Sequence, residues 1–224
     1  MLVWPRTSFL GQLSDDTRQA ALRLGTRRRH LAGEIIIQEG ARSDYVVILL
    51  SGLYKVVGLT EDGREALVAV RIGGDLVGEM GVADGEPRSA SVRAAGAGEI
   101  LRIGERNYRT LLSTYPDARA ALSQAMAAKL RSATRRRVEF ATCPVSVRVA
   151  RVLQELAVAH GVHRDGILLV EVALTQSEVA ALVGATEPTI HRVLSSMREN
   201  NILRTGYRSI HILDEERLAE LARL

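Results

Sequence analysis

The chain has 224 residues, of which 46% are hydrophobic and 25% charged, and its formal net charge is +4. This length favours two globular domains, and the positive balance permits a nucleic acid partner without proving one. No stretch approaches the roughly 18 apolar residues that span a membrane, and the N-terminus lacks a signal-peptide core, so we expect a cytoplasmic protein with no membrane partner.

The first half of the chain changes from a helical to a β-rich pattern. Residues 5–30 look helical, with apolar positions at Phe9, Leu13, Ala20, Ala21 and Leu24. From Leu31 on, glycines alternate with the short runs EIIIQ, YVVILL, YKVVGL, ALVAVRI, SASVRA and EILRI. This spacing is typical of an all-β barrel or jelly roll. Asp62-Gly63 predicts a hairpin turn between two of the strands.

A long helix is predicted over residues 117–142. Tyr115-Pro116 marks its start, and no Gly or Pro interrupts it. Its apolar residues recur at intervals of three, four or seven and are Leu122, Met126, Leu130, Ala133 and Phe140. Such a helix is about 39 Å long, more than a small barrel can cover. We expect its apolar stripe to meet its own copy in a homodimer, and packing within one chain is the alternative.

Basic residues crowd the end of this helix and the region that follows. They are Lys129, Arg131, Arg135, Arg136, Arg137, Arg148 and Arg151. A solvated helix face is the plain interpretation of such a run. Residues 145–224 hold nine Arg against ten Asp plus Glu, so that region is about neutral. This balance argues against unusually strong non-specific binding to nucleic acid.

The C-terminal region predicts a winged helix-turn-helix. Cys143-Pro144 ends the long helix, and residues 145–159 form the next one. A short strand pair is expected at residues 168–172. A hairpin around Gly206, with strands at 202–203 and 210–213, is the wing. The tail DEERLAELARL predicts a short amphipathic helix.

Residues 174–200, LTQSEVAALVGATEPTIHRVLSSMREN, are the helix-turn-helix itself. Thr175 and Glu178 predict a capping box, and Gly184-Ala185 makes the turn. Thr186 caps the second helix. The inward residues are Val179, Leu182, Val183, Ile190, Val193, Leu194 and Met197. The candidate DNA-contacting residues are Thr175, Gln176, Thr186, Glu187, Pro188, Thr189, His191, Arg192 and Ser195.

Residues 73–93, GGDLVGEMGVADGEPRSASVR, form a second candidate site. Arg88 offers a positive fork to a phosphodiester, and Ser89 offers a hydroxyl and backbone amides. Glu79 offers an acceptor for a sugar hydroxyl, and glycines such as Gly78 let the backbone approach a ligand. Residue types alone leave open a structural salt bridge between Glu79 and Arg88.

This order of parts resembles the cyclic-AMP receptor protein and fumarate–nitrate regulator family of bacterial transcription factors. GEIIIQEGARSDYVVILLSGLYKV is similar to the family's barrel strands, GEMGVADGEPRSASVRA to its cyclic-nucleotide cassette and LTQSEVAALVGATEPTIHRVLSSM to its DNA reader. The resemblance implies an α+β fold with a cyclic-nucleotide-binding β-roll (jelly roll) in residues 1–116. It also implies a dimerisation helix in 117–142 and a winged helix-turn-helix DNA-binding domain in 143–224.

The resemblance further implies the roles of individual residues. Glu79 would bind the ribose 2′-hydroxyl, and Arg88 and Ser89 the cyclic phosphate, with Gly78 and Ala90 completing the cassette. Thr134 would lie beside the purine. We expect a regulator and not an enzyme, with cyclic AMP as effector, cyclic GMP as the other candidate, and no metal. The expected partners are a palindromic double-stranded DNA operator, a second copy of the chain and RNA polymerase.

Two positions depart from the family pattern. Ala133 stands where the cyclic-AMP receptor has a hydroxyl residue, so one hydrogen bond to adenine is missing. Glu187-Pro188 replaces the frequent Arg-Glu pair, so the usual operator does not follow, although Glu187 can accept from cytosine N4 and Arg192 can grip guanine. The first departure motivates an alternative in which the nucleotide site is vestigial and DNA binding is constitutive.

A metal-dependent, cupin-like enzyme is an alternative from another class. It needs two or three histidines on barrel strands, and His30 is the only histidine before residue 160. His160 and His163 are close in sequence, but we expect them in a loop at a helix end. The single cysteine, Cys143, excludes an internal disulfide and an iron–sulfur or zinc site built from several thiolates.

Overall fold

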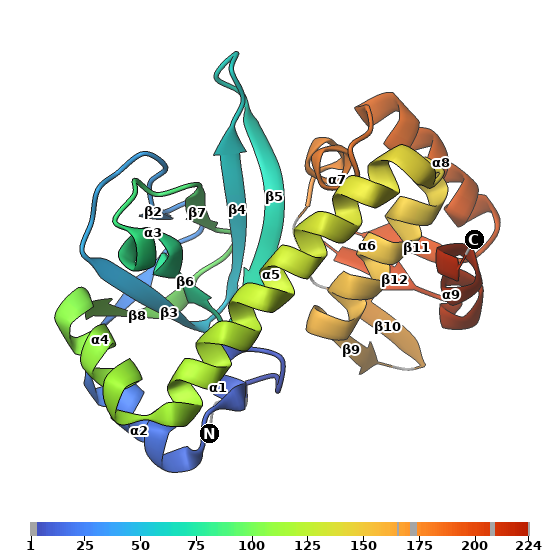
Figure 1. The fold of residues 1–224 in the computed structure, drawn as a ribbon. Helices are drawn as coiled ribbons and strands as arrows, with labels where there is room; N and C mark the ends of the chain where they lie inside the picture. Colours follow the sequence, from blue (N-terminus) through green and yellow to red (C-terminus); the bar gives the residue numbers. More distant parts are fainter. Residues whose placement is uncertain (1–3, 165, 171–173, 207–208, 224) are drawn as a thin grey trace. The chain divides into compact units, whose positions relative to one another are not determined.

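The computed structural model describes residues 4–164, 166–170, 174–206 and 209–223. The chain divides into two compact units, Met1–Arg131 and Ser132–Leu224 (Figure 1). In the described part of the chain, every helix is too short or too polar to cross a membrane.

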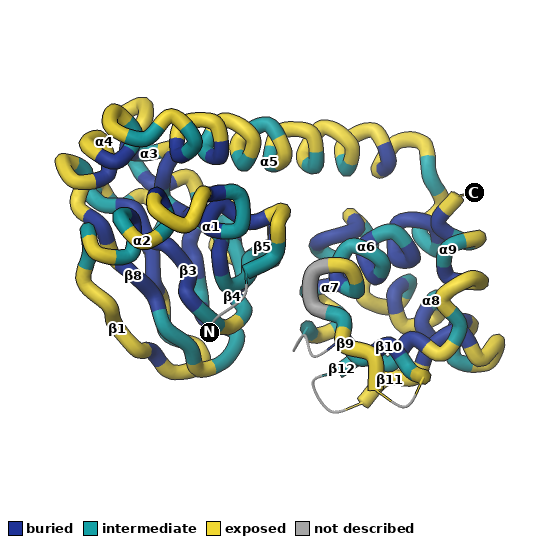
Figure 2. Tube along the Cα trace, turned by 90° about the horizontal axis from the view of Figure 1, so that it is seen from below, coloured by how far each residue is buried: buried dark blue, intermediate teal, exposed yellow. Residues whose placement is uncertain are grey.

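The chain begins with two short helices and a strand. Helices α1 (Phe9–Gln12) and α2 (Asp15–Arg23) are followed by strand β1 (Thr26–His30), so the expectation of a helix up to residue 30 is wrong. Strand β1 contains three consecutive arginines and is exposed over most of its length (Figure 2). It forms because strand β8 (Gly98–Gly104) pairs with it through backbone hydrogen bonds.

The β-rich region forms two four-stranded sheets, with the orders β1-β8-β3-β6 and β2-β7-β4-β5. The remaining strands are β2 (Ile35–Ile37), β3 (Tyr45–Ser51), β4 (Leu53–Leu59), β5 (Glu65–Ile72), β6 (Leu76–Val77) and β7 (Ser91–Ala94). Each predicted run therefore contains a strand. Asp62-Gly63 lies in the β4–β5 turn, where the positive φ of 77° at Gly63 suits glycine.

The cores of this unit lie on the two faces of β3. Val46, Ile48 and Leu50 pack with α1, α2 and the first turns of the long helix, whereas Val47 and Leu49 pack with residues of the other sheet. Because β3 is buried on both faces, its sequence is continuously apolar rather than alternating.

Two helices follow the sheets. They are α4 (Glu105–Thr114) and the 27-residue α5 (Pro116–Thr142). Ala118 and Ala121 of α5 are buried in the core of the first unit, and Leu122 packs against that core. Met126 and Leu130 are 39% and 69% exposed. The predicted stripe is thus divided, because Leu122 is covered within the chain.

The second unit contains a small sheet, with the order β11-β12-β10-β9, and several helices. Its elements are α6 (Val145–His160), β9 (Gly161–Arg164), β10 (Ile167–Val170), α7 (Gln176–Val183), α8 (Glu187–Glu199), β11 (Leu203–Gly206), β12 (Ser209–Ile212) and α9 (Glu215–Arg223). Glu171 and Val172 of the predicted strand pair lie outside the described residues. Arg151 of α6 donates to the carbonyl of Ala222 at 2.7 Å and so satisfies the C-terminal end of α9.

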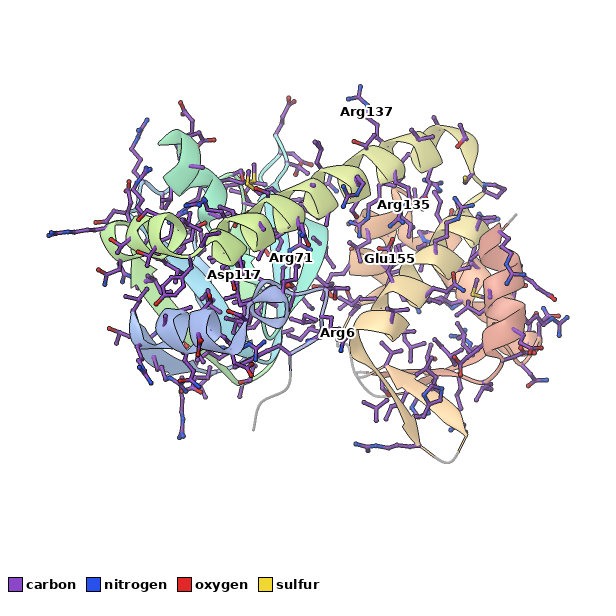
Figure 3. All side chains as sticks on the ribbon, turned by 60° about the horizontal axis from the view of Figure 1, so that its bottom comes forward. Arg6, Arg71, Asp117, Arg135, Arg137 and Glu155 are labelled. Atoms are coloured by element: carbon purple, nitrogen blue, oxygen red, sulfur yellow. The ribbon has the colours of Figure 1, made fainter. Side chains whose placement is uncertain are left out.

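The basic residues near the end of α5 are largely paired, so the expected solvated face is wrong for most of them. Arg135 forms an ion pair with Glu155 of α6, and Arg151 Nη1 lies 3.1 Å from Oε1 of the buried Glu139. Figure 3 shows Arg135 turned toward Glu155, whereas Arg137 points outward. A buried carboxylate such as that of Glu139 needs a charged partner, which explains its pairing with Arg151.

Candidate functional site

The predicted phosphate cassette surrounds the short helix α3 (Glu79–Asp84). Gly78 precedes this helix with a φ of 82°. A Cβ atom at Gly78 would lie 2.9 Å from both Arg88 Nη1 and Ile37 Cδ1, so the close approach of Arg88 requires glycine here. Glu79 and Arg88 are each only 4% exposed. The structure thus brings Gly78, Glu79 and Arg88 together in one buried cluster.

Arg88 is held by oxygen atoms of the protein and not by Glu79. Its Nε donates to Ser43 Oγ at 2.8 Å and its Nη2 to the Ser43 carbonyl at 3.2 Å. Its Nη1 and Nη2 also donate to the carbonyls of Gly78 and Tyr45. A guanidinium has five N–H groups, so one of them has no partner among the described residues. The Glu79–Arg88 salt bridge that the residue types left open does not form.

Glu79 pairs instead with Lys129 of α5, a residue that sequence reasoning did not select. Lys129 Nζ lies 2.7 Å from Glu79 Oε1 and 3.0 Å from the carbonyl of Leu76. Fifty positions separate the two charges in the chain, so their spacing in the sequence gave no signal.

A buried tyrosine, Tyr108, is influenced by the charge of Glu79. Burial and, after it, this nearby charge raise the pKa of the Tyr108 hydroxyl. Such neutral tyrosines keep their proton and can donate a hydrogen bond.

The other predicted nucleotide-binding residues differ in exposure. Ser89 is exposed and Ala90 half-buried, and both directly follow Arg88 at the approach to β7. Ala133 and Thr134 are exposed on α5, within the second unit.

The helix-turn-helix forms with the predicted caps, with one exception. The Glu178 amide donates to Thr175 Oγ1 at 3.1 Å, and the Thr175 amide donates to Glu178 Oε2 at 2.8 Å, which is the capping box. Thr186 precedes α8, but its hydroxyl lies 2.9 Å from Thr189 Oγ1 and makes no hydrogen bond to a helix amide. The expected side-chain cap at Thr186 is therefore wrong, because Thr189 takes that hydroxyl.

The outer face of α8 is polar as predicted. Glu187, Pro188, His191 and Arg192 are exposed, and Ser195 is half-buried. The opposite face carries the buried residues Ile190, Leu194 and Met197 and the half-buried Val193. Thr175 is exposed and Gln176 half-buried at the start of α7, and the N-terminus of a helix is a favourable place for a phosphate.

Two arginines that were not among the candidate DNA-contacting residues lie near the end of α8 and on β11 of the wing. Arg198 donates to Ser195 Oγ at 2.7 Å and approaches Thr205 Oγ1 of β11 at 3.4 Å, which links α8 to the wing. Arg204 of β11 is exposed and lies 3.4 Å from His211 Nδ1. The spacing of three residues between Ser195 and Arg198 was a usable signal, because such residues are neighbours on a helix.

Among the side chains that the structure describes, which do not include that of His160, no three His, Cys, Asp or Glu side chains are grouped to hold a metal ion. His163 lies on β9, with Nε2 2.9 Å from Glu215 Oε1, and not in the expected loop. His30 is buried, with Nε2 2.7 Å from the hydroxyl of Tyr54.

The β-roll cassette and the winged helix-turn-helix define a class of DNA-binding regulators with a cyclic-nucleotide-binding fold. Residues 27–115 match the family described as cyclic nucleotide-binding domain, and residues 147–221 match the Crp-like helix-turn-helix domain. The chain is 30% identical over 191 residues to the CRP-like cAMP-activated global transcriptional regulator of Mycobacterium tuberculosis, covering 85% of each protein. The cAMP-activated global transcriptional regulator Vfr of Pseudomonas aeruginosa is 31% identical over 183 residues, covering 79% of this chain and 84% of Vfr.

Solved structures show the same fold. A CRP/FNR family transcriptional regulator from Thermus thermophilus matches with a TM-score of 0.74 at 25% identity, covering 89% of this chain and 99% of that one. FixK2 from Bradyrhizobium japonicum matches with a TM-score of 0.75 at 22% identity, covering 88% and 96%. The chain belongs to the Crp/Fnr family of transcription regulators. It is therefore a DNA-binding regulator and not an enzyme, and the cupin-like alternative is wrong.

Proposed function

We propose that this regulator is a cytoplasmic homodimer that binds a palindromic operator and acts on RNA polymerase. A cyclic nucleotide bound by the residue 78–90 cassette gates its DNA binding, with cyclic AMP as the first candidate. The observation that carries this proposal is that Glu79 and Arg88 are both buried around Gly78, because a buried carboxylate and a buried guanidinium at one corner suit a ribose hydroxyl and a phosphate.

Each ligand group has a partner of matching chemistry in the cassette. Glu79 Oε1 accepts from Lys129, and we assign the second carboxylate oxygen to the ribose 2′-hydroxyl. The remaining N–H of Arg88 and the exposed hydroxyl of Ser89 are assigned to the cyclic phosphate. Thr134 of α5 is assigned to the purine, as the family resemblance implies.

The contact between Lys129 and Glu79 places a side chain of α5 at the nucleotide site. A ligand that binds Glu79 changes the electrostatic environment of an α5 side chain, and α5 continues into the second unit. The ligand shifts the population of arrangements by no more than its difference in affinity between them. In a dimer, two α8 helices must enter successive major grooves about 34 Å apart.

A second candidate function is constitutive DNA binding with a vestigial nucleotide site. Arg88 already makes four hydrogen bonds within the protein, and a doubly coordinated phosphate would have to replace at least one of them. Ala133 also lacks the hydroxyl that would meet the purine. Both observations favour weak binding or a nucleotide other than cyclic AMP.

The deciding experiment measures nucleotide binding by calorimetry and DNA binding by fluorescence anisotropy on the full chain. We expect cyclic AMP or cyclic GMP to bind and to strengthen DNA binding by about tenfold or more. Equal DNA affinity with and without either nucleotide would establish the constitutive alternative.

The site assignment is tested with Ser89→Ala and Arg88→Ala. Ser89→Ala removes an exposed hydroxyl and should weaken nucleotide binding about tenfold, the equivalent of about 1.4 kcal/mol. Arg88→Ala should abolish it, and circular dichroism checks that the variant is folded. Ser113→Ala changes an equally exposed serine on α4 and serves as control. Unchanged nucleotide affinity in folded Arg88→Ala rejects the assignment.

A further inference from the structure

An aromatic side chain at the end of α5 lies directly against the turn of the helix-turn-helix. Gly184 joins α7 to α8 with a φ of 61°. A Cβ atom at Gly184 would lie 3.1 Å from Cε1 and Cζ of Phe140 and 3.2 Å from its Cδ1. A side chain at position 184 would therefore contact the Phe140 ring more tightly than ordinary van der Waals packing, and the ring would have to shift by a few tenths of an ångström. Phe140 and Gly184 both belong to the second unit.

A buried arginine of α6 joins the ring to the same turn. Arg148 is 8% exposed, and its Nη1 donates to the Val183 carbonyl at 2.6 Å and to the Gly184 carbonyl at 3.2 Å. Its Cζ lies 5.4 Å from the centroid of the Phe140 ring. The last carbonyls of a helix lack partners within the helix and carry partial negative charge. One guanidinium thus caps α7 and contacts the ring from α5.

The last turns of α5 are themselves tied to α6. Arg135 and Arg136 both pair with Glu155, the second of them at 3.4 Å between Nη2 and Oε2. Glu139, which is 7% exposed, pairs with Arg151 at 3.1 Å. These contacts hold the helix segment that carries Phe140 in a defined position. If this segment moves relative to α6, Gly184 must consequently move as well, because closely packed atoms resist compression.

We propose that Phe140 and Arg148 form a clamp of positioning residues through which α5 sets the orientation of α8 on DNA. Phe140 is a positioning residue because it lies against the turn and not on the outer face of α8. Arg148 acts in the same way, through the carbonyls that end α7. The proposal rests on the proposed function in one respect only, namely that a bound nucleotide is what moves α5. The contacts of Phe140 and Arg148 with the turn do not require a bound nucleotide, whereas their effect on DNA affinity is largest when a nucleotide is bound.

The test compares Phe140→Ala and Phe140→Leu with the control Val138→Ala in the full chain. Val138 is 56% exposed and lies two residues earlier on α5, while Phe140 is 45% exposed. Fluorescence anisotropy gives the operator affinity with and without cyclic AMP, and hydrogen exchange reports the amides of Gly184 and Ala185. Calorimetry with cyclic AMP and light scattering check that the nucleotide site and the dimer are intact.

We expect Phe140→Ala to weaken DNA binding with nucleotide about tenfold and to reduce the response to nucleotide toward none. Exchange at Gly184 and Ala185 should rise by about the same factor, because the turn loses its cover. Cyclic AMP affinity should stay within about twofold, Phe140→Leu should restore most of the response, and Val138→Ala should behave as wild type within about twofold.

Two results would overturn the clamp. One is a Phe140→Ala protein that matches Val138→Ala in DNA affinity and in exchange at the turn. The other is an equal loss of DNA affinity with and without nucleotide in a protein whose wild type responds, since that is what packing alone produces. If wild-type DNA binding ignores nucleotide, the gating part of the proposed function fails. The clamp is then decided by comparing Phe140→Ala with Val138→Ala in DNA affinity and exchange.

Discussion

At the scale of single residues, the pair of Lys129 and Glu79 decides the character of the cassette. Glu79 is almost fully buried, and a buried carboxylate without a partner is costly. Lys129 supplies the positive charge at 2.7 Å and also reaches the Leu76 carbonyl in the preceding strand. The lysine thus holds the β6–α3 corner against α5. The carboxylate that we assign to the ribose therefore also stabilises the fold through its other oxygen.

Lys129→Met tests this pair through stability. Removing the lysine leaves a buried charge without its partner, which should lower the free energy of unfolding by about 3 kcal/mol. Urea denaturation followed by circular dichroism measures the loss. Adding Glu79→Gln to Lys129→Met should restore most of it, because no unpaired charge then remains. A Lys129→Met protein that unfolds at the wild-type urea concentration would contradict a stabilising role for the pair.

At the scale of elements, Asp117 joins α2 to the start of α5. Its Oδ2 accepts from the Ser14 amide at 3.0 Å and from the Ser14 hydroxyl at 2.9 Å. Its Oδ1 accepts from Thr17 Oγ1 at 2.8 Å. Burial by itself would raise the pKa of Asp117, but these hydrogen bonds outweigh it and hold the pKa below its usual 3.8. The ionised carboxylate is therefore the form that stabilises the joint.

Asp117→Asn should lower the free energy of unfolding by about 1 kcal/mol at neutral pH, since the carboxylate is only half-buried. The folded-state pKa is depressed, so the contribution is full above the usual pKa and disappears as the pH falls through the lower value. The difference in free energy of unfolding between wild type and Asp117→Asn should thus be constant between about pH 5 and 7 and shrink below about pH 4. Denaturation curves at several pH values measure it, and an advantage that persists in acid would be inconsistent with this role.

At the scale of the whole molecule, the exposed face of α5 suits the interface of the proposed homodimer. Met126 and Leu130 are four residues apart, so they lie on one side of the helix. Both are exposed within one chain, whereas the neighbouring Ala118 and Ala121 are buried. We therefore place the proposed dimer interface along Met126 and Leu130, and not along the whole apolar stripe.

Leu130→Glu should convert the dimer to a monomer, because it introduces a charge where two apolar faces meet. Operator affinity should fall by about a hundredfold or more, since the two halves of the operator are then bound separately. Sedimentation velocity gives the mass, and Gln124→Glu, which adds the same charge at another exposed position of α5, serves as control. A Leu130→Glu protein that remains dimeric would place the interface elsewhere.

Local sequence signals predicted the elements that depend on local interactions. The capping box at Thr175 and Glu178 and the turn at Gly184 were legible because their partners lie within a few residues. The strands around β3 were legible because burial leaves an apolar run. Strand β1 could not be predicted in this way. Its three arginines show no alternation of apolar and polar residues, and the strand forms only because it pairs with β8.

The sequence by itself determined the capping box at Thr175 and Glu178, the turns at Gly63 and Gly184, most of the strands and helices, and the candidate residues of the cassette and the reader helix. Only the tertiary structure decided which charges meet: Glu79 with Lys129, Arg88 with backbone carbonyls, and Arg148 with the turn at Gly184. The physical reason is the distance along the chain over which each kind of interaction acts. Helix caps and alternation act between neighbours in the chain, whereas the partner of a buried charge is whichever group the fold brings within a few ångströms.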